Sequence, residues 1–117
     1  MTTMSDQEAL NSRQRAEATR RQTFLDRSVA GLGHGWADHM RDELRREGRT
    51  AAGGWPGTMR EARTRVERLL LPALAREHLP ETTSDERLAL TRGLYAAARR
   101  HWLEQCDADD EDDDLDD

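Results

Sequence analysis

The sequence predicts an all-α domain, and three observations lead to that class. Apolar residues recur at three-and-four spacing in several segments, which is the pattern of amphipathic helices. No stretch alternates apolar and polar residues with a period of two. Val29 and Val66 are the only β-branched aliphatic residues among 117 positions. A chain of this length has room for one core, so we expect a small irregular bundle of about four helices.

A first helix is predicted to begin near Ser5, because Ser5 and Glu8 have the order of a capping box. It is expected to end near Gly31. Leu10 is the only large apolar residue in its first half, so residues 1–21 are expected to form a polar, partly frayed arm outside the bundle domain, residues 22–106. The second half carries an apolar stripe of Phe24, Leu25, Val29 and Leu32.

Three alternating glycines, Gly31, Gly33 and Gly35, predict a break after this helix, because a positive φ is easily adopted there. Beyond the break, large apolar residues recur every fourth position. This spacing predicts a second helix over residues 36–47, stopped by Gly48. Its stripe consists of Trp36, Met40 and Leu44.

The segment 51–57 is too rich in Gly and Pro to be regular, and a second capping box, Thr58 to Glu61, predicts the start of a third helix. Pro72 lies inside the apolar pattern, where it removes a backbone donor, so the helix is expected to kink or restart there. Pro80 closes the segment. The predicted core stripe is Met59, Ala62, Val66, Leu69, Leu70, Ala73 and Leu74.

A third capping box, Thr83 to Glu86, predicts the start of a fourth helix that runs to about Gln105. Nine of the residues 107–117 are acidic, whereas the rest of the chain carries 18 arginines against 15 acids and no lysine. So acidic a segment buries little apolar surface, and we expect it to be a disordered tail. The predicted inner face is Leu88, Thr91, Tyr95, Ala98 and Trp102.

Composition also indicates in which cellular compartment the protein is expected. Cys106 is the only cysteine, which excludes an internal disulfide and favours a reducing cytoplasm. No run of about 18 apolar residues is present, and the first ten residues lack the basic-then-apolar order of a secretion signal. We therefore expect a cytoplasmic protein with no membrane partner.

No pattern marks a catalytic or metal centre. His39 and Glu43 lie one helical turn apart, a spacing that metal sites use, but no second spaced pair accompanies them. Cys106 borders the acidic segment, where neighbouring carboxylates oppose formation of a thiolate. We expect neither an enzyme nor a cofactor.

The leading functional hypothesis is a helical adaptor or regulator that binds another protein or a second copy of itself through the first helix. Trp55 is either a core residue or an exposed anchor for that partner. The residues predicted to bind the partner are Leu10, Arg13, Arg20, Arg21, Phe24, Leu25 and Trp55.

Two alternatives remain. The first is a nucleic-acid-associated regulator whose acidic tail competes with phosphates for an arginine ridge on the first helix, although the sequence pI of about 5.2 argues against it. The second is a small enzyme or ligand-binding domain that uses the turn at residues 53–57 as an anion cradle. The residues of that candidate site are Gly54, Gly57, Thr58, Arg60 and Arg63.

Overall fold

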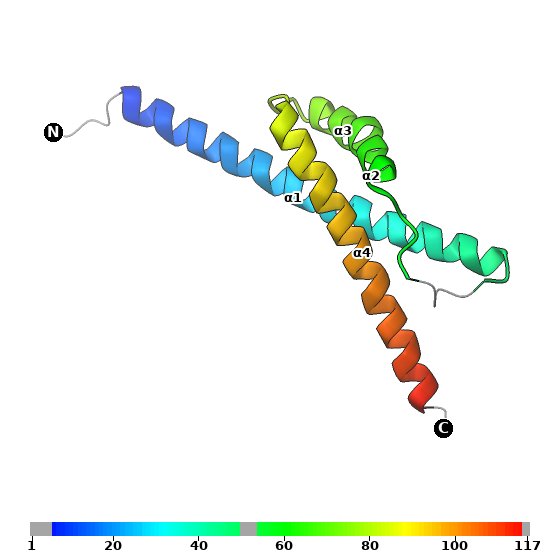
Figure 1. Cartoon of the computed structure of the whole chain (residues 1–117). Coiled ribbons are helices and arrows are strands. Elements are labelled where there is room, and N and C mark those ends of the chain that lie inside the picture. The colour runs from blue at the N-terminus through cyan, green and yellow to red at the C-terminus, as the bar shows by residue number, and fades with distance from the viewer. Residues whose placement is uncertain (1–5, 50–53, 116–117) are drawn as a thin grey trace.

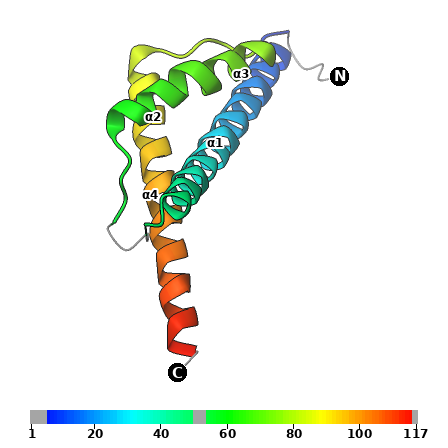
Figure 2. The same ribbon diagram turned by 90° about the vertical axis from the view of Figure 1, so that its right-hand side faces the viewer.

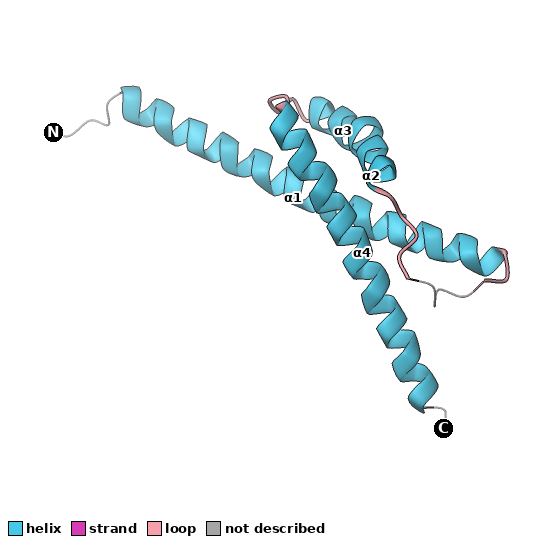
Figure 3. Cartoon of the chain, viewed as in Figure 1, coloured by secondary structure: helices cyan, strands magenta, loops and turns pink. Residues whose placement is uncertain are grey.

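A computed structural model describes residues 6–49 and 54–115, with side chains up to Cys106. All regular structure in these residues is helical, which confirms the all-α prediction (Figure 3). The elements are α1 (Asp6–Arg46), α2 (Met59–Arg65), the π-helical turn η2 (Val66–Leu70), α3 (Leu71–Arg76) and α4 (Ser84–Leu115).

Two long helices set the shape of the molecule. Helices α1 and α4 cross one another, and the segment from α2 to α3 lies against both of them on one side (Figures 1 and 2). Both long helices extend beyond this crossing, so the molecule measures 74 × 31 × 21 Å. The first third of α1 and the last third of α4 therefore project from a small packed body.

The predicted glycine break in α1 is wrong, because a single helix runs through it from Asp6 to Arg46. Gly33 is buried where α1 crosses α4. A Cβ at this position would lie 2.9 Å from the Cβ of Ala97 and 3.0 Å from the backbone nitrogen of Ala98. This glycine therefore permits a close approach of two helices rather than a turn. The expected cap at Ser5 lies outside the described residues.

Helix α1 ends as expected before Gly48, which has a φ of +72°. The amide of Gly48 donates to the carbonyl of Arg45 at 3.0 Å, and that of Arg49 donates to the carbonyl of Leu44 at 2.8 Å. These bonds satisfy two of the last carbonyls of the helix, and a left-handed residue at this position favours glycine.

The α2 to α3 segment begins and restarts where the sequence predicts. The hydroxyl of Thr58 accepts a hydrogen bond from the amide of Glu61 at 3.2 Å. Pro72 lies in the first turn of α3, directly after the π-helical turn, so the predicted restart is confirmed. The amide that proline lacks is not needed at the start of a helix.

The π-helical turn explains which residues of this segment are buried. They recur at every fourth position, a longer period than the 3.6 residues of an α-helix, and a π turn is wound more loosely. The turn therefore keeps the stripe facing α1 and α4, while Leu69, predicted in the stripe, is 48% exposed. The buried residues are Ala62, Val66, Leu70 and Leu74.

Helix α4 begins at the predicted capping box but ends later than expected. The amide of Glu86 donates to the hydroxyl of Thr83, and the amide of Thr83 donates to the Glu86 carboxylate, both at 3.1 Å. The helix continues to Leu115 instead of ending near Gln105. The backbone of residues 107–115 is thus helical where a disordered tail was expected.

The core consists of two adjoining clusters. The larger contains Trp36, Val66, Leu94 and Trp102 at the crossing of α1 and α4. The smaller joins Leu25 of α1 to Leu70, Leu74 and Leu79. Besides Leu69, two residues predicted to face the core lie on the surface: Met59 is 41% exposed and Leu88 is 49% exposed.

Candidate functional site

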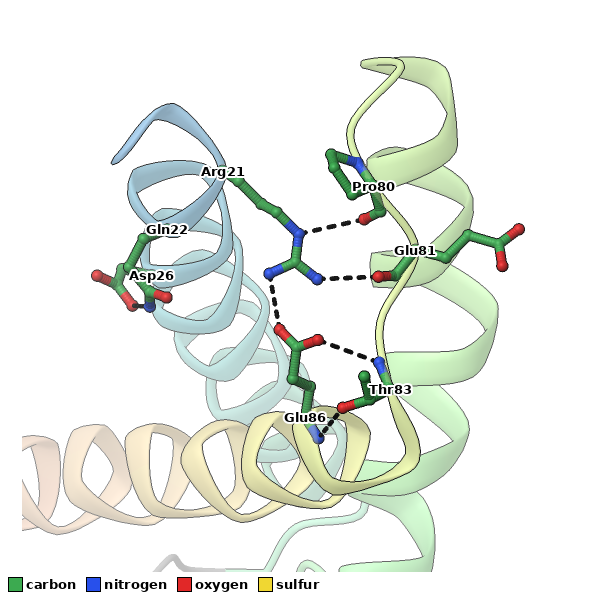
Figure 4. A network of polar contacts seen from close by, with 7 residues as sticks. All are labelled: Arg21, Gln22, Asp26, Pro80, Glu81, Thr83 and Glu86. Carbon is green, nitrogen blue, oxygen red and sulfur yellow. Dashed lines mark hydrogen bonds and ion pairs between the residues drawn. The ribbon is translucent and has the colours of Figure 1, made fainter. Parts of the chain in front are cut away.

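Arg21 fixes the point at which α1 leaves the packed body. Its guanidinium donates three hydrogen bonds, one to the carboxylate of Glu86 at 2.7 Å and two to the backbone carbonyls of Pro80 at 3.2 Å and Glu81 at 3.1 Å. Figure 4 shows these contacts joining α1 to the loop before α4 and to the first turn of that helix. Glu86 thus caps α4 and binds Arg21 at the same time.

The electrostatics of this contact favour the charged carboxylate. The hydrogen bond from Arg21 lowers the pKa of Glu86 from its ordinary value, and the hydrogen bond from the Thr83 amide lowers it further. The side chain of Arg21 is only 16% exposed. This partly buried, charge-assisted contact is stronger than an isolated surface ion pair.

Before Arg21, helix α1 projects alone. Among the described residues, neither core cluster includes a residue before Phe24. Between residues 6 and 20, Ala9 and Asn11 are half-buried and the others are exposed. We call residues 6–20 the arm; Figure 1 shows it extending away from α4 and the α2 to α3 segment.

The predicted partner-binding residues of α1 fall into two groups. Leu10, 47% exposed, lies on the arm together with the exposed Arg13 and Arg20. Leu25 is 3% exposed and packs within the smaller core cluster, so a partner cannot reach it in this fold. Arg21 is committed to the contact with α4 described above, and Phe24 is half-buried against the smaller cluster.

A depression of about 530 Å³ lies where the arm meets the body. Phe24 and the two arginines Arg20 and Arg27 line it, together with Thr23 and Ser28. Arg20 and Phe24 are among the residues predicted to bind the partner, and Arg27 is not. Their positions at i, i+4 and i+7 place all three on one face of the helix.

Trp55 is half-buried and packs against the larger core cluster. Its ring lies edge-on to Trp36 at 4.8 Å and to Trp102 at 5.5 Å between ring centroids. A Cβ on Gly57 would lie 2.2 Å from the Trp55 ring, so Gly57 gives that ring its space. The three indole nitrogens are buried without a hydrogen-bond partner among the described residues, so apolar burial and edge contacts hold this cluster together.

Several residues of the predicted anion site contact other residues of the chain instead. Gly57 faces the Trp55 ring, and the hydroxyl of Thr58 donates to the Glu61 carboxylate at 3.0 Å. Arg63 forms an ion pair with Glu67 at 3.0 Å. A carboxylate thus lies at the start of α2, where a bound anion would be expected.

Arg60 and Arg63 instead line a groove between the α2 to η2 segment and the first turns of α4. Its volume is about 680 Å³. A third arginine, Arg87, approaches it from α4, and Met59 and Leu88 expose apolar surface along it. The groove was not predicted, because Arg87 lies more than twenty positions from Arg60 and Arg63 and only the packing of α2 on α4 brings it beside them.

Three of the four histidines form local pairs. The rings of His34 and His101 stack at 4.4 Å, and Nε2 of His101 lies 2.9 Å from a carboxylate oxygen of Asp38. His39 pairs with Glu43 at 3.1 Å, as their spacing suggests. Within residues 6–49 and 54–106, no three metal-ligating side chains come together.

Comparison with protein-family models, curated proteins and solved structures finds no match to this chain. Among the described helices, none combines the length and the apolar character that crossing a membrane requires. The arm, the depression at its base and the cationic groove are therefore the features from which a function is inferred.

Proposed function

We propose that this protein is a small helical adaptor or regulator that binds a partner protein through the arm of α1. The observation that carries this proposal is the projection of the arm, residues 6–20, as a helix that packs on nothing among the described residues. A helix of about 15 residues is only marginally stable in water by itself. A partner that covers the arm would supply the missing packing.

The chemistry of the arm indicates the kind of surface it fits. Leu10 is the only large apolar residue, and Arg13 and Arg20 are exposed beyond it. The depression beside Phe24 adds apolar surface at the base of the arm. This combination suits a groove with one apolar pocket and an acidic rim, in the mode of a helix laid into a groove.

The Arg21 contact supports this function by holding the arm in one direction. Three hydrogen bonds join its guanidinium to α4 and to the preceding loop. A helix fixed in advance loses less conformational entropy on binding. The single cysteine favours a reducing cytoplasm as the setting for the interaction.

The test compares two full-length triple variants as baits in a nuclease-treated native lysate. The arm variant carries Leu10→Asp, Arg13→Glu and Arg20→Glu. The control variant carries Leu69→Asp, Arg45→Glu and Arg46→Glu, which makes the same chemical changes at exposed positions off the arm; Leu69 is 48% exposed and Leu10 is 47% exposed.

Quantitative mass spectrometry compares the proteins that the wild type, the arm variant and the control variant retain. We expect a defined protein that the wild type and the control variant retain and that the arm variant loses. Circular dichroism checks that both variants keep their helix content. Equal retention by the arm variant would show that binding does not use the arm.

Nucleic-acid binding is a second candidate, favoured by the exposed Arg13, Arg20 and Arg27, which follow one another at intervals of seven residues on one helix face. Replacing these three arginines by glutamine should then abolish binding of labelled duplex DNA at low salt. Fluorescence polarisation of the labelled DNA measures this binding. Wild-type protein that leaves the DNA unbound at about 50 mM salt excludes this function.

A further inference from the structure

We propose that the groove between α2 and α4 binds the acidic C-terminal segment, residues 107–117, of a second copy of this chain. The proposal concerns a different surface from the arm and does not depend on it. It begins with the charge of the groove. Arg60, Arg63 and Arg87 line it, while Glu67 is its only acidic lining residue.

That charge is only partly neutralised within the described residues. Arg63 pairs with Glu67 at 3.0 Å. Arg87 donates to the neutral hydroxyl of Ser84 at 3.0 Å, and Arg60 makes no ion pair with a described side chain. The groove therefore presents two guanidinium groups to an anionic ligand.

The groove also exposes apolar surface beside its arginines. Met59 is 41% exposed and Leu88 is 49% exposed, at the starts of the two helices that form its walls. A small inorganic anion would leave this surface uncovered. The better ligand is a peptide that carries several carboxylates and at least one apolar side chain.

The C-terminal segment of this chain has that chemistry. Nine of its eleven residues are acidic, and Leu115 is its single large apolar residue. Leu115 could cover Met59 and Leu88 while neighbouring carboxylates face the arginines. Asp and Glu in such a segment pair with arginine through charge-assisted hydrogen bonds, which individually contribute little at a surface but act together in a cluster.

The segment cannot reach the groove of its own chain. Helix α4 runs without interruption from Ser84 to Leu115. At a rise of about 1.5 Å per residue, Leu115 lies about 42 Å along the helix from Arg87. Figures 1 and 2 show the end of α4 leading away from α2 and α3. A second copy, with its α4 antiparallel to the first, would exchange segments reciprocally in a twofold dimer.

Sedimentation velocity on full-length variants tests this dimer at low and high salt, about 50 and about 500 mM. The groove variant carries Arg60→Gln, Arg63→Gln and Arg87→Gln. In the segment variant, the five acids of residues 110–114 become Asn or Gln. The control carries Arg45→Gln, Arg46→Gln and Arg76→Gln, all exposed and outside the groove.

We expect the wild type and the control to dimerise with an affinity that falls as salt rises. Each of the other two variants should dimerise about tenfold more weakly or not at all. Mixing the groove variant with the segment variant should restore some dimer, because one intact groove then meets one intact segment. That complementation separates a contact between copies from an effect of charge on folding.

Three results would overturn the proposal. One is a wild type that stays monomeric at low salt, and another is a dimer that the groove and segment variants leave unchanged. The third is a groove that binds duplex DNA in wild-type protein through the same arginines without any dimer. Failure of the dimer would leave the arm proposal standing, since the arm variant is assayed by partner binding and keeps groove and segment intact.

Discussion

Replacing Gly33 by alanine gives the sharpest test of the crossing between α1 and α4. In a helix interior, glycine to alanine alone should stabilise by about 1 kcal/mol. At Gly33, however, the new methyl would lie 2.9 Å from the Ala97 Cβ, 3.0 Å from the Ala98 nitrogen and 3.2 Å from the Leu94 carbonyl oxygen. Two of these three atoms are backbone atoms, which cannot swing aside. The two helices would have to move apart.

Forcing one extra methyl into a packed interior costs about 1 to 3 kcal/mol. After subtracting the gain of about 1 kcal/mol in helix propensity, we expect Gly33→Ala to lower the free energy of unfolding by up to about 2 kcal/mol. Urea denaturation followed by circular dichroism at 222 nm, ~25 °C, measures that free energy.

Gly31 and Gly35 provide matched controls on the same helix. A Cβ at either position meets nothing within 4 Å. Alanine there should raise the free energy of unfolding by about 0.5 to 1 kcal/mol, since only the helix propensity changes. If Gly33→Ala proves as stable as Gly31→Ala, the close approach of the helices is refuted.

The remaining predictions concern the Arg21 contact and the aromatic cluster. Arg21→Gln should lower the free energy of unfolding by about 1 kcal/mol, because one partly buried hydrogen bond to a carboxylate and two exposed hydrogen bonds to carbonyls are lost; an unchanged urea midpoint contradicts this. Since the contact lowers the pKa of Glu86, its stabilisation is present above the ordinary Glu value, about 4.3, and is lost as the pH falls through the lower folded pKa. The wild type should therefore lose more stability than Arg21→Gln in urea titrations as the pH falls from about 5 to about 3. Trp55→Ala should cost about 2 to 3 kcal/mol by thermal denaturation, less than a fully buried Trp, and a near-neutral result would place Trp55 outside the core.

Sequence reasoning worked best where the signal was local. The helix starts at Thr58 and Thr83 were predicted from residues three positions apart. Thr83 and Glu86 exchange both hydrogen bonds of a capping box, and the Thr58 hydroxyl accepts the hydrogen bond from the Glu61 amide. The restart at Pro72 follows from the missing amide of a single residue. Such features depend on neighbours in the chain, so the chain itself reveals them.

Sequence reasoning failed where a distant segment decides the role of a residue. Gly33 resembles a turn glycine in sequence, and it is a helix-crossing glycine only because Ala97 and Ala98 lie against it. Leu25 was predicted to bind a partner, but it is buried in one cluster with Leu70 and Leu74. Neither neighbour can be inferred from the three-and-four periodicity of one helix.

The candidate sites divide in the same way. Leu10, Arg13 and Arg20 were predicted as an exposed binding surface from a helix segment with almost nothing to bury, and the fold leaves all three exposed. The cationic groove was not predicted, because Arg60 and Arg87 come together only through the packing of α2 on α4.

By itself, the sequence determined that this protein is helical, where most helices begin, and that its charge separates into an arginine-rich body and an acidic end. Periodicity, capping and composition are properties of adjacent residues, and they suffice for these conclusions. The packing of the helices shows in addition that α1 is one continuous helix and that Arg21 holds the base of its arm. It also decided that three arginines form a groove, because each of these outcomes depends on contacts between helices that are far apart along the chain.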